Sequence, residues 1–176
     1  QGRIPQQYVP AIEKGIRKTI EKGVVAGYPV VDVEVEVYDG SYHDVDSGPA
    51  SFELAGSKAF KDAFAKARPV ILEPVVHIEI TVPSKFMGDI TGDLNSRRGR
   101  IEGMDTRGQM QVVRAHIPMM EIMDYETQLR SVTGGEGSYA IDPSHYDVLP
   151  HKPGKGTVVR DEHRVICHKV ERCVFR

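Results

Sequence analysis

The chain has 176 residues, 40% of them hydrophobic, which is enough for one ordinary domain or two small ones with buried cores. Its formal net charge of −2 argues against a general nucleic-acid binder. No apolar run approaches the roughly 18 residues of a membrane helix, and the first residues lack the parts of a secretory signal. The two cysteines, Cys167 and Cys173, form no disulfide framework, which favours a cytosolic protein.

The first 72 residues predict two helices and one strand. Apolar residues recur every three or four positions over residues 8–22, which is typical of an amphipathic helix, and Gly23 follows as its cap. Residues 29–38 alternate valine with acidic residues, which indicates a half-buried strand. After a polar loop at 39–49, residues 50–66 predict a second helix.

A second unit begins near Pro74. The expected elements are strands at 76–82, 100–104, 109–117 and 138–150 and helices at 88–97 and 119–132. Their β-α-β-β-α-β order is the split βαβ pattern of a ferredoxin-like domain. Residues 158–175 are compatible with either strand or coil.

Charge is distributed unevenly along the chain. Residues 151–176 contain seven basic and three acidic side chains, a net charge of +4, so the remaining residues carry −6. Any RNA contact by residues 1–150 therefore has to come from a local cluster such as Arg97, Arg98 and Arg100.

Several enzymatic motifs are absent from the sequence. It contains no G-x-x-x-x-G-K-[ST] phosphate loop, no G-x-S-x-G, no H-E-x-x-H and no C-x-x-C. Cys167 and Cys173 have His163 and His168 nearby, but the spacing fits no common zinc pattern, and two unrelated thiols are the favoured interpretation.

Residues 41–47 are the first candidate site and allow several interpretations. A metal site would use His43, Asp44 and Asp46, and a catalytic site would pair His43 with an aspartate. A protruding loop could instead insert Tyr42 and His43 into an RNA groove. From spacing alone, a polar turn that caps the following helix is favoured.

Two further segments are candidates for contact with RNA. Arg97, Arg98 and Arg100 could grip phosphates, or they could offset the dipole at a helix C-terminus, and the two interpretations are about equal. The glycines of residues 134–138 could admit an RNA backbone, although a plain helix-to-strand turn is the default.

The sequence resembles elongation factor G over about residues 2–150, in family order. The strings at 4–16, 26–33 and 40–47 resemble its fourth domain, and those at 72–74, 87–99, 125–131 and 137–139 resemble its fifth.

The resemblance implies an α+β fold in three parts. Residues 1–72 would be the C-terminal part of the fourth domain, a partial βαβ unit similar to the second domain of ribosomal protein S5. The family has an unusual left-handed crossover there, against the general right-handed rule. Residues 73–150 would be the ferredoxin-like fifth domain, and residues 151–176 a basic tail of unknown structure that does not match the family.

The resemblance also implies a role in GTP-dependent translocation of tRNA and mRNA on the ribosome. Tyr42, His43, Asp44 and Val45 would lie at the tip that enters the decoding region. The arginines at 97, 98 and 100 are the expected contacts to large-subunit rRNA near the GTPase-associated centre.

Several expectations concern the complete factor. GTP and magnesium would bind in a GTPase domain that this sequence lacks, so no catalytic residue, metal site or GTP hydrolysis is expected here. The partners would be the ribosome, tRNA and mRNA in the cytoplasm, with no membrane and no homo-oligomer. The first strands of the fourth domain would precede Gln1, which makes residues 1–72 the less stable unit.

Two alternatives remain open. A relative that acts in ribosome recycling or ribosome protection shares the same domains, although the string at 42–46 favours the translocase. A standalone RNA-binding module is the other alternative.

Overall fold

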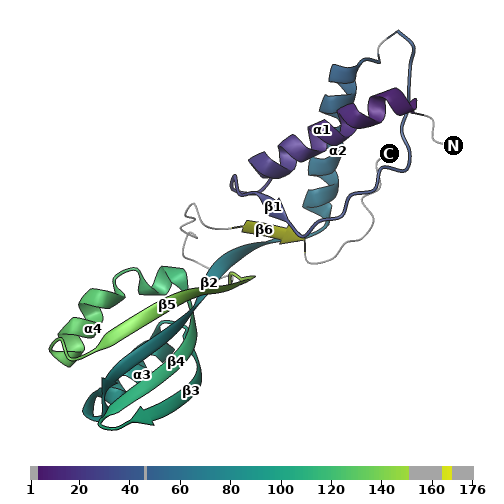
Figure 1. Ribbon diagram of the computed structural model, residues 1–176. Coiled ribbons are helices and arrows are strands. Elements are labelled where there is room, and N and C mark those ends of the chain that lie inside the picture. Colours follow the sequence, from purple (N-terminus) through teal and green to yellow (C-terminus); the bar gives the residue numbers. More distant parts are fainter. Residues whose placement is uncertain (1–3, 46, 151–163, 168–176) are drawn as a thin grey trace. The chain divides into compact units, whose positions relative to one another are not determined.

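The computed structural model describes residues 4–45, 47–150 and 164–167, the last four as backbone only. It mixes helices with mainly antiparallel strands, so the fold belongs to the α+β class, as predicted. The chain divides into two compact units: Glu73–Asp147 forms the second, and the residues on either side form the first (Figure 1).

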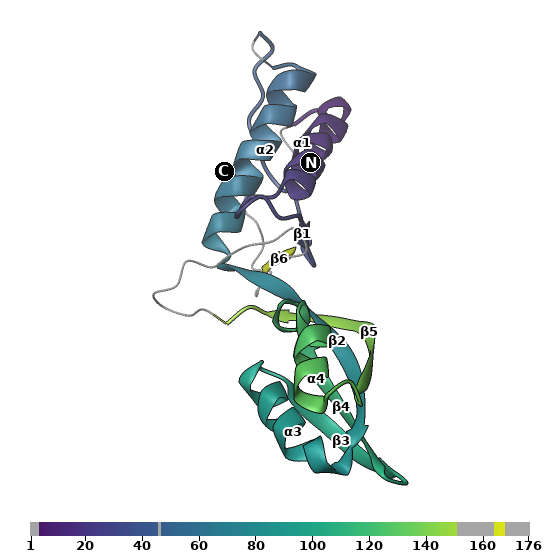
Figure 2. The same cartoon turned by 90° about the vertical axis from the view of Figure 1, so that its left-hand side faces the viewer.

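Two helices pack side by side in the first unit (Figures 1 and 2). α1 spans Val9–Lys22 after a short 3-10 turn, η1, at Gln6–Tyr8, and α2 spans Pro49–Lys66. Their backbones approach so closely that a Cβ at Gly15 would lie 2.0 Å from the carbonyl oxygen of Glu53. Both predicted helices are confirmed.

The core of the first unit lies between these helices and the segment that follows α1. Side chains at helical spacing face inward from both helices, as the sequence pattern predicts. The buried residues are Ile12, Ile16, Tyr28, Val30, Phe52, Phe60 and Phe64.

The strand expected at 29–38 forms only at its start and is wrong for the rest. β1 spans Val30–Val31, and Asp32 then turns the chain with a φ of 52°. Val33 and Val35 still pack against the core, so the alternation correctly indicated an extended segment with one buried face. A strand also needs the backbone of a neighbour, and no residue in the described parts of the chain supplies one beyond β1.

The strand β6, Arg164–Cys167, also belongs to the first unit. It is parallel to β1 and antiparallel to residues 69–72 of β2, the strand that spans Pro69–Pro83. Four of the residues at 158–175 are therefore strand, and the others lie outside the described residues. Because β6 lies between β1 and β2, those two strands are not parallel neighbours, and the left-handed crossover stays a prediction.

The second unit follows the predicted β-α-β-β-α-β order. Its elements are β2 (Pro69–Pro83, which starts in the first unit), the 3-10 turn η2 (Ser84–Phe86), α3 (Met87–Ser96), β3 (Arg100–Arg107), β4 (Met110–Pro118), the 3-10 turn η3 (Met119–Ile122), α4 (Tyr125–Thr133) and β5 (Ser138–Val148). β4 is antiparallel to both β2 and β3, and the strand order is β5-β2-β4-β3. The ferredoxin-like pattern is thus confirmed.

The core of this unit lies between the sheet and the two helices. α3 and α4 cover one face, and the apolar residues of β2 and β4 point toward them; the largest fully buried members are Ile78, Ile80, Ile90, Leu94, Ile117 and Tyr125. The alternate residues of the strands form the opposite, polar face. Among the described residues, no helix is long and apolar enough to cross a membrane.

Candidate functional site

The loop at 41–47 is closed by two hydrogen bonds between His43 and Ser47. The His43 N–H donates to the Ser47 hydroxyl at 3.0 Å, and the Ser47 N–H donates to the His43 carbonyl at 3.1 Å. Asp44 and Val45 form the turn between them, and the Val45 side chain is 93% exposed. The loop therefore presents His43, Asp44 and Val45 to the outside on a short, internally bonded turn.

Tyr42 differs from the other three predicted contact residues because its ring is partly buried against the core of the first unit. A hydrogen bond to the Asp44 carboxylate is the main cause that raises the pKa of the Tyr42 phenol above its ordinary value of 10.0. The phenol is thus neutral at physiological pH. Tyr42 anchors the start of the loop, whereas His43 and Val45 are its exposed part.

Tyr8 also contacts this loop, although no sequence pattern had pointed to it. Its ring centroid lies 5.7 Å from that of Tyr42, and its hydroxyl donates to the Ser47 carbonyl at 3.4 Å. The sequence gives no local signal for this contact, because Tyr8 lies 39 positions before Ser47.

No metal cluster forms in the described residues. No group of three or more histidine, cysteine, aspartate or glutamate side chains there is placed to hold an ion. Asp46, the third ligand of the metal interpretation, lies outside the described residues, as do Cys173, His163 and His168.

Arg97 is held by partners within the chain. Its guanidinium contacts the carboxylates of Asp93 and Asp124, each at 3.0 Å, and donates to the carbonyl of Glu121. Its side chain is only 16% exposed. These contacts tie the end of α3 to the segment before α4.

Arg98 forms a second tie, from α3 to the start of β2. It makes an ion pair with the Glu73 carboxylate, which is 2% exposed, and a longer contact of 3.5 Å with Glu121. The hydrogen bond to Glu73 raises the pKa of Arg98 above its ordinary value. A buried carboxylate needs such a cation, so the first role of Arg98 is structural.

Arg100 is the most accessible of the three arginines. Its side chain is 80% exposed, and its guanidinium lies 3.5 Å from the carboxylate of Asp147, a long contact for an ion pair. Contact of the three arginines with rRNA stays a prediction, and Arg100 is the one whose charge is most available for it.

The glycine-rich segment at 134–138 forms the turn between α4 and β5. Gly134 caps α4 in the left-handed conformation with a φ of 62°, and Gly135 follows with a φ of 88°. A helix-to-strand turn explains both glycines. Contact of this segment with RNA stays a hypothesis.

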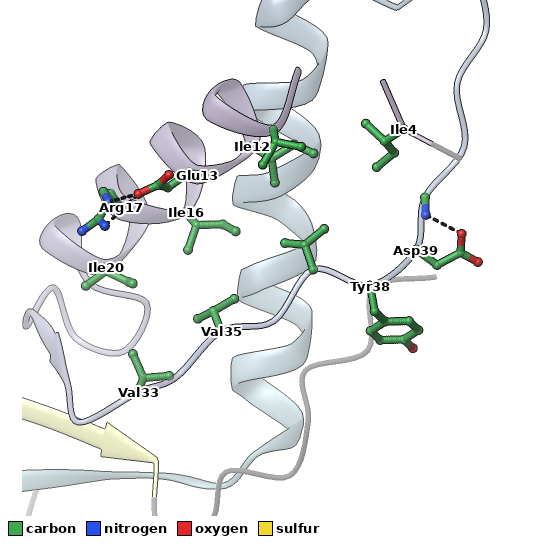
Figure 3. A pocket seen from close by; sticks show the side chains of 13 residues that line it. Ile4, Ile12, Glu13, Ile16, Arg17, Ile20, Val33, Val35, Tyr38 and Asp39 are labelled. Atoms are coloured by element: carbon green, nitrogen blue, oxygen red, sulfur yellow. Dashed lines mark hydrogen bonds and ion pairs between the residues drawn. The ribbon is translucent and has the colours of Figure 1, made fainter. Parts of the chain in front are cut away.

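An apolar groove of about 520 Å³ runs between α1 and the extended segment after β1 (Figure 3). Ile12, Ile16 and Ile20 line one side, and Val33 and Val35 line the other. The figure shows these side chains pointing toward one another, with the Glu13–Arg17 pair at the rim. Most of the residues that line the groove are aliphatic.

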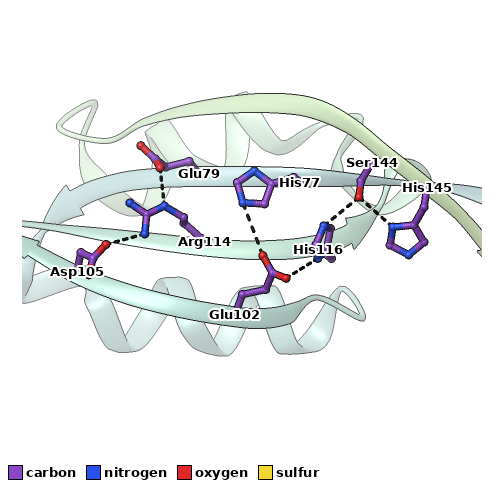
Figure 4. Close-up of polar contacts among 8 residues, drawn as sticks. All are labelled: His77, Glu79, Glu102, Asp105, Arg114, His116, Ser144 and His145. Atoms are coloured by element: carbon purple, nitrogen blue, oxygen red, sulfur yellow. Dashed lines mark hydrogen bonds and ion pairs between the residues drawn. The ribbon is translucent and has the colours of Figure 1, made fainter.

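The polar face of the second unit carries a chain of paired side chains (Figure 4). Glu102 contacts His116 at 3.0 Å and His77 at 3.7 Å. Arg114 contacts Glu79 at 2.8 Å, and also Asp105. Because Arg114, the fixed cation among these residues, is paired with two carboxylates, this cluster offers little free positive charge for a phosphate backbone.

Two family models cover most of the chain. One, described as Elongation factor G, domain IV, matches residues 1–68, and another, described as Elongation factor G C-terminus, matches residues 70–156.

Individual relatives agree with these matches. An elongation factor G of Aquifex pyrophilus is 51% identical over 149 residues, which are 85% of this chain and 21% of that protein. A crystal structure of a Thermus thermophilus protein matches with a TM-score of 0.71 and 44% identity, over 84% of this chain and 22% of the other. The chain thus spans about a fifth of the length of these relatives.

Proposed function

Since the chain belongs to the elongation factor G family of translational GTPases, we propose that it forms the part of a translation elongation factor that contacts the ribosome during translocation of tRNA and mRNA. The observation that carries this proposal is the loop at 41–47, which is closed on itself and exposes His43, Asp44 and Val45. A short, bonded loop loses little conformational freedom when it enters an RNA groove.

The proposed role of His43 is a hydrogen bond or a stacking contact with RNA of the decoding region. An imidazole ring can stack on a base, and its two nitrogens can donate or accept hydrogen bonds. The exposed Val45 supplies an apolar contact beside it. Tyr42 supports the loop from within rather than touching RNA through its ring.

The second unit would contact large-subunit rRNA near the GTPase-associated centre, chiefly through Arg100. Arg97 and Arg98 would support that contact by fixing the end of α3. GTP and magnesium would bind elsewhere in the complete cytoplasmic factor, since the sequence of this chain has no phosphate loop.

The test uses a chimera in which this chain replaces the matching part of the Aquifex pyrophilus factor. We expect His43→Ala to slow translocation about tenfold in rapid kinetics, because a positioned group in an RNA site contributes about 1–3 kcal/mol. GTP hydrolysis on the ribosome and the melting temperature should stay unchanged, since His43 is exposed.

Glu21→Ala is the matched control, because Glu21 is an exposed residue of α1 in the same unit. Normal translocation by His43→Ala would refute the role of this loop. A chimera that supports recycling or protection of ribosomes but no translocation would favour the related factors instead.

A further inference from the structure

The ring of Tyr8 lies between the start of α2 and the start of the loop at 41–47. It stacks on Phe52, with ring centroids 4.6 Å apart and planes inclined by 23°. The centroid of the Tyr42 ring lies 5.7 Å from that of Tyr8, with the planes inclined by 32°. Phe52 is buried in the core of the first unit, so this stack joins the loop to a fixed support.

The hydroxyl of Tyr8 reaches the other end of the same loop. It donates to the carbonyl of Ser47, and Ser47 in turn exchanges two hydrogen bonds with His43. A single side chain therefore contacts both the residue before His43 and the residue that closes the turn around it. Tyr8 itself is partly buried and is not part of the exposed tip.

We propose that Tyr8 is a positioning residue that fixes the loop in the conformation in which His43 meets RNA, and this inference rests on the function proposed above. A loop that is already ordered loses less entropy on binding, and it holds the imidazole in the correct place. Without Tyr8, residues 42 and 47 would lose a shared support, and the tip would sample orientations that do not bind.

The test compares two substitutions at this position in the chimera. Tyr8→Phe keeps the stack on Phe52 and loses only the hydroxyl, whereas Tyr8→Leu loses both. We expect Tyr8→Leu to slow translocation about tenfold, approaching the effect of His43→Ala, and Tyr8→Phe to give a smaller effect. GTP hydrolysis should stay normal in both variants.

Two further measurements separate positioning from simple loss of stability. The Ser47 amide, bonded to His43, should exchange with solvent about tenfold faster in Tyr8→Leu. The double variant with His43→Ala should be slowed by less than the product of the two single effects, because Tyr8 and His43 act through the same loop. Phe60→Leu is the control: Phe60 is buried in the same core, and its ring stacks on Phe64, so this change should lower the melting temperature and leave translocation unchanged.

The outcomes distinguish the two proposals. If Tyr8→Leu translocates as fast as Phe60→Leu while His43→Ala is slow, the role of Tyr8 is overturned and the function of the loop stands. If His43→Ala is also fast, the proposed function itself fails. Should Tyr8→Leu not fold, Tyr8→Phe decides: an unchanged Ser47 exchange rate together with unchanged translocation would overturn the inference.

Discussion

In the second unit, the strand β2 pairs with β4 on one side and with β5 on the other. In the first unit, the valines at 33–37 line an apolar groove, and they pair with no strand among the described residues. Both segments have the same alternating sequence pattern. In the second unit that pattern is satisfied twice, by burial of alternate side chains and by backbone pairing. In the first unit it is satisfied only by burial.

The two units also differ in the size of their cores and in where their candidate functional residues lie. The second unit closes its core with two helices over a four-stranded sheet, and its candidate arginines are largely engaged in holding that structure. The first unit has a smaller core, and its candidate residues lie on an exposed loop. A rigid support beneath such a loop is a common arrangement in binding proteins.

Hydrogen exchange of the isolated chain should reveal the largest contrast between the units. The amides of residues 76–82 are paired inside a sheet and should exchange only through global unfolding, which slows exchange by about 10³-fold or more. The amides of Val33 and Val35 pair with no strand among the described residues and should exchange much faster. Slow exchange within α1 would show that the first unit is folded. Equal protection of the two valine segments would contradict the comparison.

A smaller effect is expected from removing the ion pair between Arg98 and Glu73. Arg98→Met should lower the free energy of unfolding by about 2–3 kcal/mol, because the buried carboxylate loses its cation. Arg100→Met is the matched control and should change it by less than about 0.5 kcal/mol, since Arg100 is exposed. Urea denaturation measures both. If Arg98→Met and Arg100→Met unfold at the same urea concentration, Arg98 does not stabilise the fold, and its charge is available for phosphate.

The sequence predicted the helices and the order of the second unit because both depend on local spacing. The valine segment shows the limit, since alternation reports which face is buried and not whether a neighbouring strand exists. The arginines show another limit. Phosphate contact and compensation of the helix dipole were equally compatible with the sequence, and the decisive partner of Arg98 lies 25 positions away at Glu73.

The candidate loop was identified from the resemblance of its residues to the family, because spacing alone favoured a polar turn. In the structure, the residues of this loop have different roles. Tyr42 is partly buried and anchored, while Val45 is exposed at the tip. The contact of Tyr8 with both ends of the loop depends on the packing of α1 against α2, which no local pattern encodes.

The most direct test of the central claim is photocrosslinking from the tip of the loop on the ribosome. A benzophenone amino acid at position 45 of the chimera should crosslink to tRNA, mRNA or small-subunit rRNA of the decoding region, because Val45 is 93% exposed. The same group at position 54, exposed on α2, should give no such crosslink. If the bound factor crosslinks from position 45 only to large-subunit rRNA or to no RNA, the loop is not the decoding-site contact.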